Sequence, residues 1–141
     1  MSGKNQFPFV FEWFSVNPIT LFQPQRANQS AYPLTGGTAT GAMASTNTIY
    51  SQILDVSKID NSGLEITWTG TPTGTLSILV SNSGVNFYAL TFNPALTQPG
   101  GSGGGYAVNL NQLPFKYMLL QYTNGSGTGV LSVYGQNKDL N

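Results

Sequence analysis

The sequence lacks cysteine and histidine, and it contains few charged residues. Without cysteine the chain can form no disulfide, no thiolate zinc site and no thiol nucleophile. Without histidine it has neither the usual general base nor a Ser-His or Cys-His catalytic pair. Only 7% of the residues are charged, against about 25% in an average soluble domain. The sequence therefore predicts a protein that is not an enzyme and that carries no cofactor.

The few charges that are present balance one another. Five basic and five acidic residues give a formal net charge of +0, and the basic residues form no cluster, so we expect no nucleic-acid partner. No apolar run approaches the ~20 residues of a membrane helix, so we expect no membrane partner either. The apolar stretch near the N-terminus is broken by Pro8 and Glu12. Because no small-residue cleavage site follows it, we interpret it as part of the mature protein.

Three acidic residues, Asp55, Asp60 and Glu65, lie close together in the sequence. Two carboxylates flanking a sugar could support glycoside hydrolysis, and Asp55 and Asp60 with Asn61 could bind calcium. However, Asp60 begins the sequence Asp-Asn-Ser-Gly, which is typical of a turn. We therefore interpret these acids as solvated turn residues and assign no catalytic and no metal-binding residue.

Residues 48–141 have the pattern of a β domain. Apolar residues alternate with polar ones in residues 64–69 and 76–81, which is typical of half-buried strands, and the sequence GTPTG between them predicts a hairpin turn. Residues 122–133 repeat this pattern. Three explanations of the repeat stay open. Either hairpins resemble one another because few sequences form them, or the segment derives from an ancient duplication, or two hairpins pack pseudo-symmetrically. The sequence predicts an all-β fold, an antiparallel β-sandwich of jelly-roll or immunoglobulin-like type, with Trp68 and Tyr122 in its core.

Residues 1–47 differ from this domain because aromatic residues crowd their beginning and prolines interrupt them. Prolines disfavour a central strand, and residues 35–47 are small and polar, as in a linker. We therefore predict an extended N-terminal arm. Its aromatic side chains cannot remain exposed as one patch, so they either fold onto the domain or insert into a partner subunit. The predicted partner interface consists of Phe7, Phe9, Phe11, Trp13, Phe14 and Phe22.

No charged residue occurs from Ile66 to Phe115. Edge strands of soluble monomers usually carry protective Lys or Pro residues, and such proteins keep their net charge away from zero. The long uncharged stretch therefore predicts a surface covered by neighbouring subunits, as in a homo-oligomer. The alternative interpretation is a glycan-binding platform, because sugar rings stack on exposed aromatic side chains. The candidates for such a platform are Tyr88, Tyr106 and Tyr134.

Several segments between residues 48 and 138 share a pattern of strand, glycine-rich turn and strand. The pattern comprises Tyr50-Ser51, Asp55-Val56-Ser57, LEITWTGTPTG (64–74), VSNSGVNF (80–87) and LQYTNGSGTG (120–129). It resembles a recurrent group of small β-sandwich virion proteins of bacteriophages. Ser83 stands where the pattern often has Asp, and Phe87 where it often has Trp, and both changes leave the turn intact. The resemblance implies a non-enzymatic, capsid-associated or tail-associated β-sandwich.

Taken together, these features predict a multi-copy virion structural protein: a decoration, minor capsid or connector subunit. Its arm and its sandwich would stabilise the assembly, and its partners would be the major capsid protein or neighbouring subunits. We expect it in the virion, which is assembled in the host cytoplasm. The alternative is a carbohydrate-binding module for host-surface glycans, as the receptor-binding part of a tail or head fibre.

Overall fold

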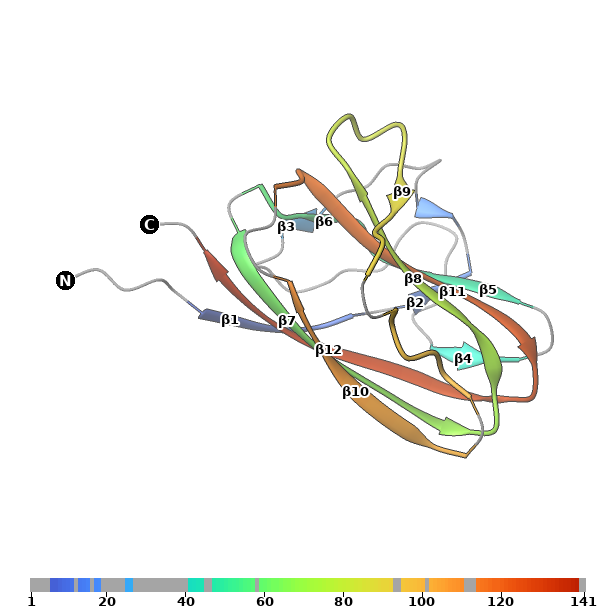
Figure 1. The fold of residues 1–141 in the computed structure, drawn as a ribbon. Helices are drawn as coiled ribbons and strands as arrows, with labels where there is room; N and C mark the ends of the chain where they lie inside the picture. The colour runs from blue at the N-terminus through green and yellow to red at the C-terminus, as the bar shows by residue number, and fades with distance from the viewer. Residues whose placement is uncertain are drawn as a thin grey trace.

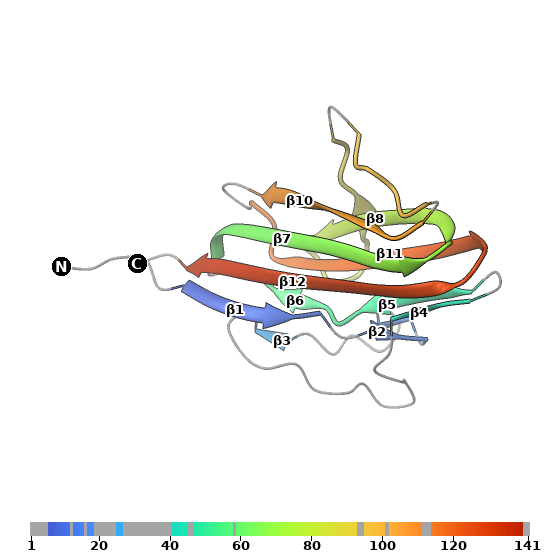
Figure 2. The ribbon, with the colours of Figure 1, turned by 90° about the horizontal axis from the view of Figure 1, so that it is seen from below.

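A computed structural model describes residues 6–11, 13–15, 17–18, 25–26, 41–44, 47–57, 59–92, 95–100, 102–110 and 114–139. The described ranges contain the β-strands β1 to β12, arranged in two packed sheets (Figures 1 and 2). All strand pairs but one are antiparallel, which confirms the predicted all-β sandwich. Among the described residues, no helix has the length and hydropathy that crossing a membrane requires.

The first sheet has the order β10-β7-β12, and the N-terminal part of the chain covers the remaining edge of β12. Strands β1 and β4 both pair with that edge. Between them, Phe11 N donates to Val133 O at 3.0 Å and Leu131 N donates to Gly41 O at 2.8 Å. The strands of this sheet are β1 (Gln6–Val10), β4 (Ala42–Met43), β7 (Ile59–Gly70), β10 (Gly104–Leu110) and β12 (Gly129–Asp139).

The second sheet is built around β11, which pairs with β8 on one side and with β5 and β6 on the other. Strand β9 continues the sheet beyond β8, β2 pairs with β5, and β3 lies parallel to β6. The strands of this sheet are β2 (Trp13–Phe14), β3 (Gln25–Arg26), β5 (Thr48–Ser51), β6 (Leu54–Asp55), β8 (Thr73–Ser81), β9 (Tyr88–Ala89) and β11 (Tyr117–Ser126).

The two predicted hairpins are not hairpins, and this corrects the sequence interpretation. Strands β7 and β8 lie in different sheets, and so do β11 and β12. Each glycine-rich connection therefore crosses from one sheet to the other, a separation of about 10 Å. The two crossings lie against each other, because β7 pairs with β12 and β8 pairs with β11. The sequence repeat thus corresponds to two similar arches packed antiparallel.

Two glycines make the corners of these arches possible. Gly70 ends β7 with φ +80°, and Gly127 lies between β11 and β12 with φ +75°. Both angles belong to the left-handed region, which costs side-chain-bearing residues free energy. Thr71 N, just after Gly70, donates to Thr128 O at 2.9 Å and joins the two corners. The two corners therefore lie together, and both crossings between the sheets are fixed at the same end of the sandwich.

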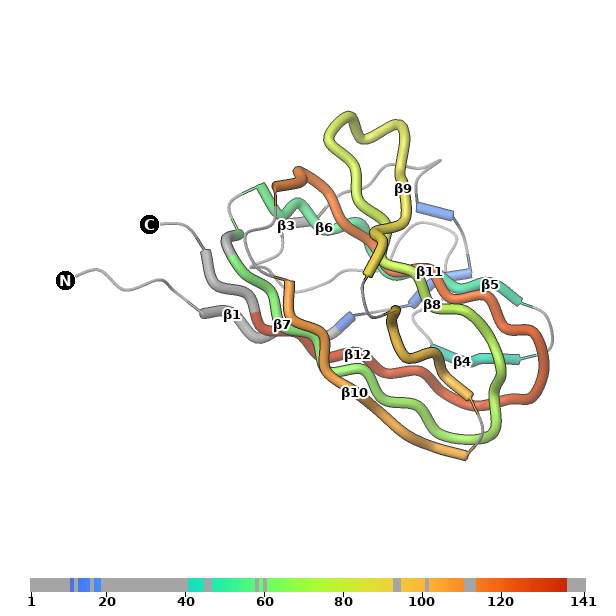
Figure 3. Tube along the Cα trace, viewed as in Figure 1, coloured from blue at the N-terminus to red at the C-terminus, as the bar shows by residue number. Residues whose placement is uncertain are grey.

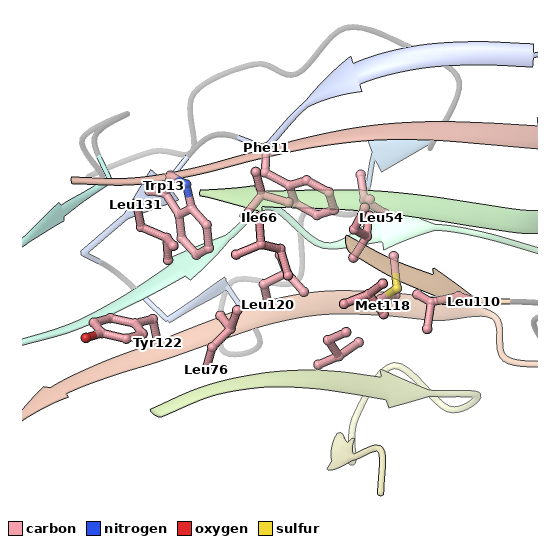
Figure 4. Packing of buried hydrophobic residues seen from close by; sticks show 14 of the residues in the cluster. Phe11, Trp13, Leu54, Ile66, Leu76, Leu110, Met118, Leu120, Tyr122 and Leu131 are labelled. Carbon is pink, nitrogen blue, oxygen red and sulfur yellow. The ribbon is translucent and has the colours of Figure 1, made fainter. Parts of the chain in front are cut away.

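The interior between the sheets is filled by apolar side chains from both of them (Figure 4). Trp68 and Tyr122 are buried, as predicted. Phe11 and Trp13 point into the same interior, and Phe14 has no exposed surface. These three side chains are therefore core residues of their own chain. The expectation that they contact a partner subunit is corrected, because burying them here already removes their apolar surface from water.

The described part of the N-terminal region is an edge of the sandwich and not an arm that extends from it. Phe7 and Phe9 lie on β1, whose backbone pairs with β12, and their side chains are outside the described residues. Phe22 also lies outside them. Within the expected linker, β4 pairs with β12. Each of the two sheets therefore contains strands from before and from after the predicted boundary at residue 47.

Candidate binding surfaces

A shallow hollow lies on the outer face of the first sheet, across β10, β7 and β12. Because side chains alternate along β7, Leu64, Ile66 and Trp68 point into the core and the intervening residues point outward. In the register of the sheet, Glu65 lies opposite Ala107 and Tyr134, so the three share the outer face. The hollow measures about 500 Å³ and is lined by Gly63, Leu64, Glu65, Ala107, Val108, Asn109, Tyr134, Gly135 and Gln136.

The depth of the hollow follows from the small residues at its base, and its chemistry from the side chains around them. Gly63 and Ala107, whose positions face outward, leave space that larger side chains would fill. Glu65 supplies a carboxylate, Asn109 and Gln136 supply amides, and Tyr134, which is 48% exposed, supplies an aromatic ring. An aromatic face beside amide and carboxylate groups can bind a polar, ring-shaped ligand by stacking and hydrogen bonding.

The three neighbouring acids of the sequence do not come together in a site. Glu65 is exposed on β7, whereas Asp55 lies on β6 in the second sheet. Asp55 Oδ1 accepts hydrogen bonds from Ser57 N at 3.0 Å and from Ser57 Oγ at 2.6 Å, which is a local turn contact. The Asp60 side chain is outside the described residues. Within the described ranges, no three acidic side chains gather as metal ligands do.

The three tyrosines proposed as one glycan platform lie on different surfaces, and this corrects that interpretation. Tyr134 is on the outer face of the first sheet, whereas Tyr88 is on β9 of the second. Tyr106 lies opposite the buried Ile66 and packs against the core, with its ring edge-on to Trp68 at 6.1 Å between centroids. Burial raises the pKa of Tyr106 to about 12. Only Tyr134 lines the hollow.

The turn between β8 and β9 projects from the sandwich (Figure 3). It is held by serine hydroxyls, because Ser81 Oγ accepts from Gly84 N at 2.9 Å and Ser83 Oγ accepts from Asn86 N at 3.1 Å. Gly84 adopts φ +78°. The turn therefore presents Val85 and Tyr88 to solvent, with 73% and 69% of their surfaces exposed. We call Asn82–Tyr88 the projecting turn.

No protein-family model matches the chain, and no curated protein sequence matches it. Among solved structures, the SPBc2 prophage-derived protein YomS is 13% identical, with a TM-score of 0.47, and the match covers 99% of this chain and 97% of YomS. A CBM4 structure is 12% identical with a TM-score of 0.42, and the match covers 73% of this chain and 74% of that one. At these identities neither match identifies a function.

Sequence reasoning found some residues of these surfaces and missed others. The alternation around Glu65 places it outward, but nothing local shows that Asn109 and Gln136 come from the two adjacent strands. Val85 was also missed, although the Ser-Asn-Ser-Gly sequence before it predicts a turn. A single apolar residue directly after a turn was the available signal for the projecting turn.

Proposed function

We propose that the chain is a non-enzymatic structural subunit of a bacteriophage virion, present in many copies and bound to neighbouring subunits. The observation that carries this proposal is the position of the uncharged stretch from Ile66 to Phe115. It supplies the C-terminal end of β7 from Ile66 to Gly70, the whole of β8, β9 and β10, and the projecting turn. Side chains there can be buried by a neighbour without leaving a charge unpaired, which would be costly.

The projecting turn is the proposed contact of this subunit with its neighbour. Val85 and Tyr88 are the most exposed large apolar side chains among the described residues. Tyrosine anchors such as Tyr88 supply much of the binding energy when a partner pocket desolvates them, and Val85 adds apolar surface that the same contact can bury. The sequence predicted the contact with a neighbouring subunit at the aromatic N-terminal residues. We place it instead at the projecting turn, in the uncharged part of the sandwich. Its finer role would be that of a decoration, minor capsid or connector subunit.

The test is incorporation into particles of the phage that encodes the chain. We expect V85S/Y88S to fold normally, because both side chains are exposed, but to be depleted from purified particles in quantitative mass spectrometry. The matched control is V130S, which removes an exposed valine from the first sheet and should leave occupancy unchanged. Absence of the unmodified chain from the particles would refute the virion role. Full occupancy of V85S/Y88S would refute the contact.

A second candidate function is glycan binding in the hollow of the first sheet. The specific observation is that Tyr134, Glu65, Asn109 and Gln136 surround small residues on one open face. Y134A should abolish binding to host-surface polysaccharide in calorimetric titration, whereas Y88A should leave it unchanged. If the unmodified chain binds no glycan on an array or in titration, this candidate is excluded and the virion proposal is unaffected.

A further inference from the structure

Two strand edges of the sandwich are covered by the chain itself. The outer edge of β12 is covered by β1, Phe11, Gly41 and β4. The outer edge of β8 is covered at several points: Leu90 N donates to Ile78 O at 2.8 Å, and the side-chain amide of Gln98 bonds both the N–H and the C=O of Leu76. Such covering prevents unwanted pairing with other chains.

Strand β10 is different, because its outer edge has no partner among the described residues. It pairs with β7 alone, and it lies at the margin of its layer (Figure 2). Its sequence from Gly104 to Leu110 contains no charge and no proline, which are the usual protections of an edge. A seven-residue strand with these properties can accept another strand.

The hydrogen bonds of β12 show which backbone groups of β10 point away from β7. Leu131 and Val133 bond to the N-terminal region, so the alternate residues of β12, including Tyr134, bond to β7. Tyr134 lies opposite Glu65, so Glu65 bonds toward β12 and its neighbour Ile66 bonds toward β10. Ile66 lies opposite Tyr106. The backbone N–H and C=O of the intervening residues of β10 therefore point away from β7; these residues are Gly105, Ala107 and Asn109.

We propose that β10 pairs antiparallel with β10 of a second copy of this chain about a two-fold axis at Ala107. The three outward-pointing residues are spaced symmetrically about Ala107, so this register places Gly105 opposite the second copy's Asn109 and satisfies every free N–H and C=O of the three. The inference concerns the isolated chain and does not depend on a role in a virion.

The side chains of β10 are compatible with this register. A two-fold axis places Ala107 opposite Ala107, and a charged residue there would face the same charge. Gly105, Ala107 and Asn109 are exposed residues, and they are small enough to lie opposite one another. Between these positions Tyr106 lies opposite Val108 of the second copy, on the side that faces the core. Self-pairing therefore requires no rearrangement of the strand.

The first experiment measures self-association of the full chain by sedimentation over a concentration series. We expect the unmodified chain to form a dimer. A107P removes a donor that points outward, so the pairing with β7 is kept. The symmetric loss of two hydrogen bonds should raise the dimer Kd roughly 30-fold. A107K should raise it about fivefold at low salt, and less as salt is added. V130K is the control, since Val130 is exposed two strands away.

The second experiment tests the register with a short bis-maleimide cross-linker. The chain has no cysteine, so A107C offers one thiol per copy, and the pairing places the two thiols of a dimer next to each other. A107C should be cross-linked and V130C should not. Circular dichroism confirms the fold of each variant. A chain that remains monomeric at all concentrations overturns the proposal, and so does a dimer that A107P and A107K leave unchanged or that cross-links equally through V130C.

Discussion

The buried residue Asn124 connects three parts of the chain at one corner of the sandwich, two through its side chain and one through its backbone. Its Oδ1 accepts from Tyr122 Oη at 2.9 Å, and its Nδ2 donates to Gly127 O at 2.9 Å. Its backbone N–H donates to Asn47 O at 2.9 Å. The side chain thus satisfies a buried hydroxyl and fixes the glycine turn that follows.

We expect N124A to lower the free energy of unfolding by about 2 kcal/mol, because it leaves the buried Tyr122 hydroxyl without its acceptor. Urea unfolding measures this change. In a double-mutant cycle with Y122F, the loss caused by N124A should shrink once the hydroxyl is absent. Equal losses in both backgrounds would show that the hydroxyl contact contributes nothing.

We expect the protein to lose stability at alkaline pH, because two of its tyrosines are removed from solvent. Burial raises the pKa of Tyr106 from 10.0 to about 12, and it raises the pKa of Tyr122 as well. Between the unfolded and folded pKa values the folded state binds more protons. The contribution of these tyrosines to the free energy of unfolding should therefore be constant below about pH 9 and fall as the pH rises from about 10 towards 12.

Urea unfolding at a series of pH values tests this dependence, and Y106F identifies the group. The Tyr106 hydroxyl is buried and has no hydrogen-bond partner among the described residues, so removing it should cost no stability at neutral pH. Y106F should make the alkaline fall shallower. If Y106F and the unmodified chain lose stability in parallel, Tyr106 is not the titrating group.

At the level of elements, the arches depend on glycine at their corners, and Gly70 gives a direct test. It has φ +80°, and a Cβ added there would collide with Thr128 O and approach the Gly129 Cα at 2.7 Å. We expect G70A to lower the free energy of unfolding by more than about 2 kcal/mol, from backbone strain and the collision together. Thermal unfolding with calorimetry measures it.

Gly63 provides the matched control within the same strand. A Cβ at Gly63 meets nothing within 4 Å, so G63A should unfold near the temperature of the unmodified chain, or slightly above it because the unfolded chain loses freedom. If G70A and G63A behave alike, the corner does not require glycine.

The strands could be predicted from the sequence, but their partners could not. The alternation in residues 64–69 correctly places Ile66 and Trp68 inward, because a half-buried strand has that pattern wherever it pairs. A glycine-rich link of five residues suits either a hairpin or a crossing between sheets. The choice depends on β12, far away in the sequence, which occupies the edge of β7 that β8 was expected to take. The hollow was unpredictable for the same reason.

The chain between residues 48 and 55 forms two short strands, β5 and β6, and not one continuous strand. Ser51 ends β5, and its hydroxyl accepts a hydrogen bond from Leu120 N at 2.8 Å. It therefore replaces the carbonyl that a continuous strand would offer to β11. Val56 N restores the backbone contact beyond β6 by donating to Lys116 O at 2.8 Å. A serine that substitutes for a strand carbonyl gives no signal in the hydrophobic pattern.

For the whole molecule, the N-terminal residues complete the fold. The sequence correctly singled out their aromatic side chains as residues that need burial, but it could not show that the chain's own core receives them. Phe11 and Trp13 are each 3% exposed, and Phe14 is 0% exposed. Strand β1 also supplies the partner for one end of β12, over Tyr134–Lys138. Both sheets would lose an edge and the core would lose three aromatic residues without this region.

We therefore expect deletion of residues 1–34 to abolish cooperative folding, instead of leaving a folded sandwich. Removing each buried aromatic side chain costs about 3–5 kcal/mol, and three such losses reach the total stability of a typical domain, about 5–15 kcal/mol. Near-ultraviolet circular dichroism and thermal unfolding measure the outcome. The control is a chain beginning at Gln6, which keeps every described strand and should unfold cooperatively. A truncated chain from residue 35 that melts cooperatively near the temperature of the full chain would show that the sandwich is complete without its N-terminal strands.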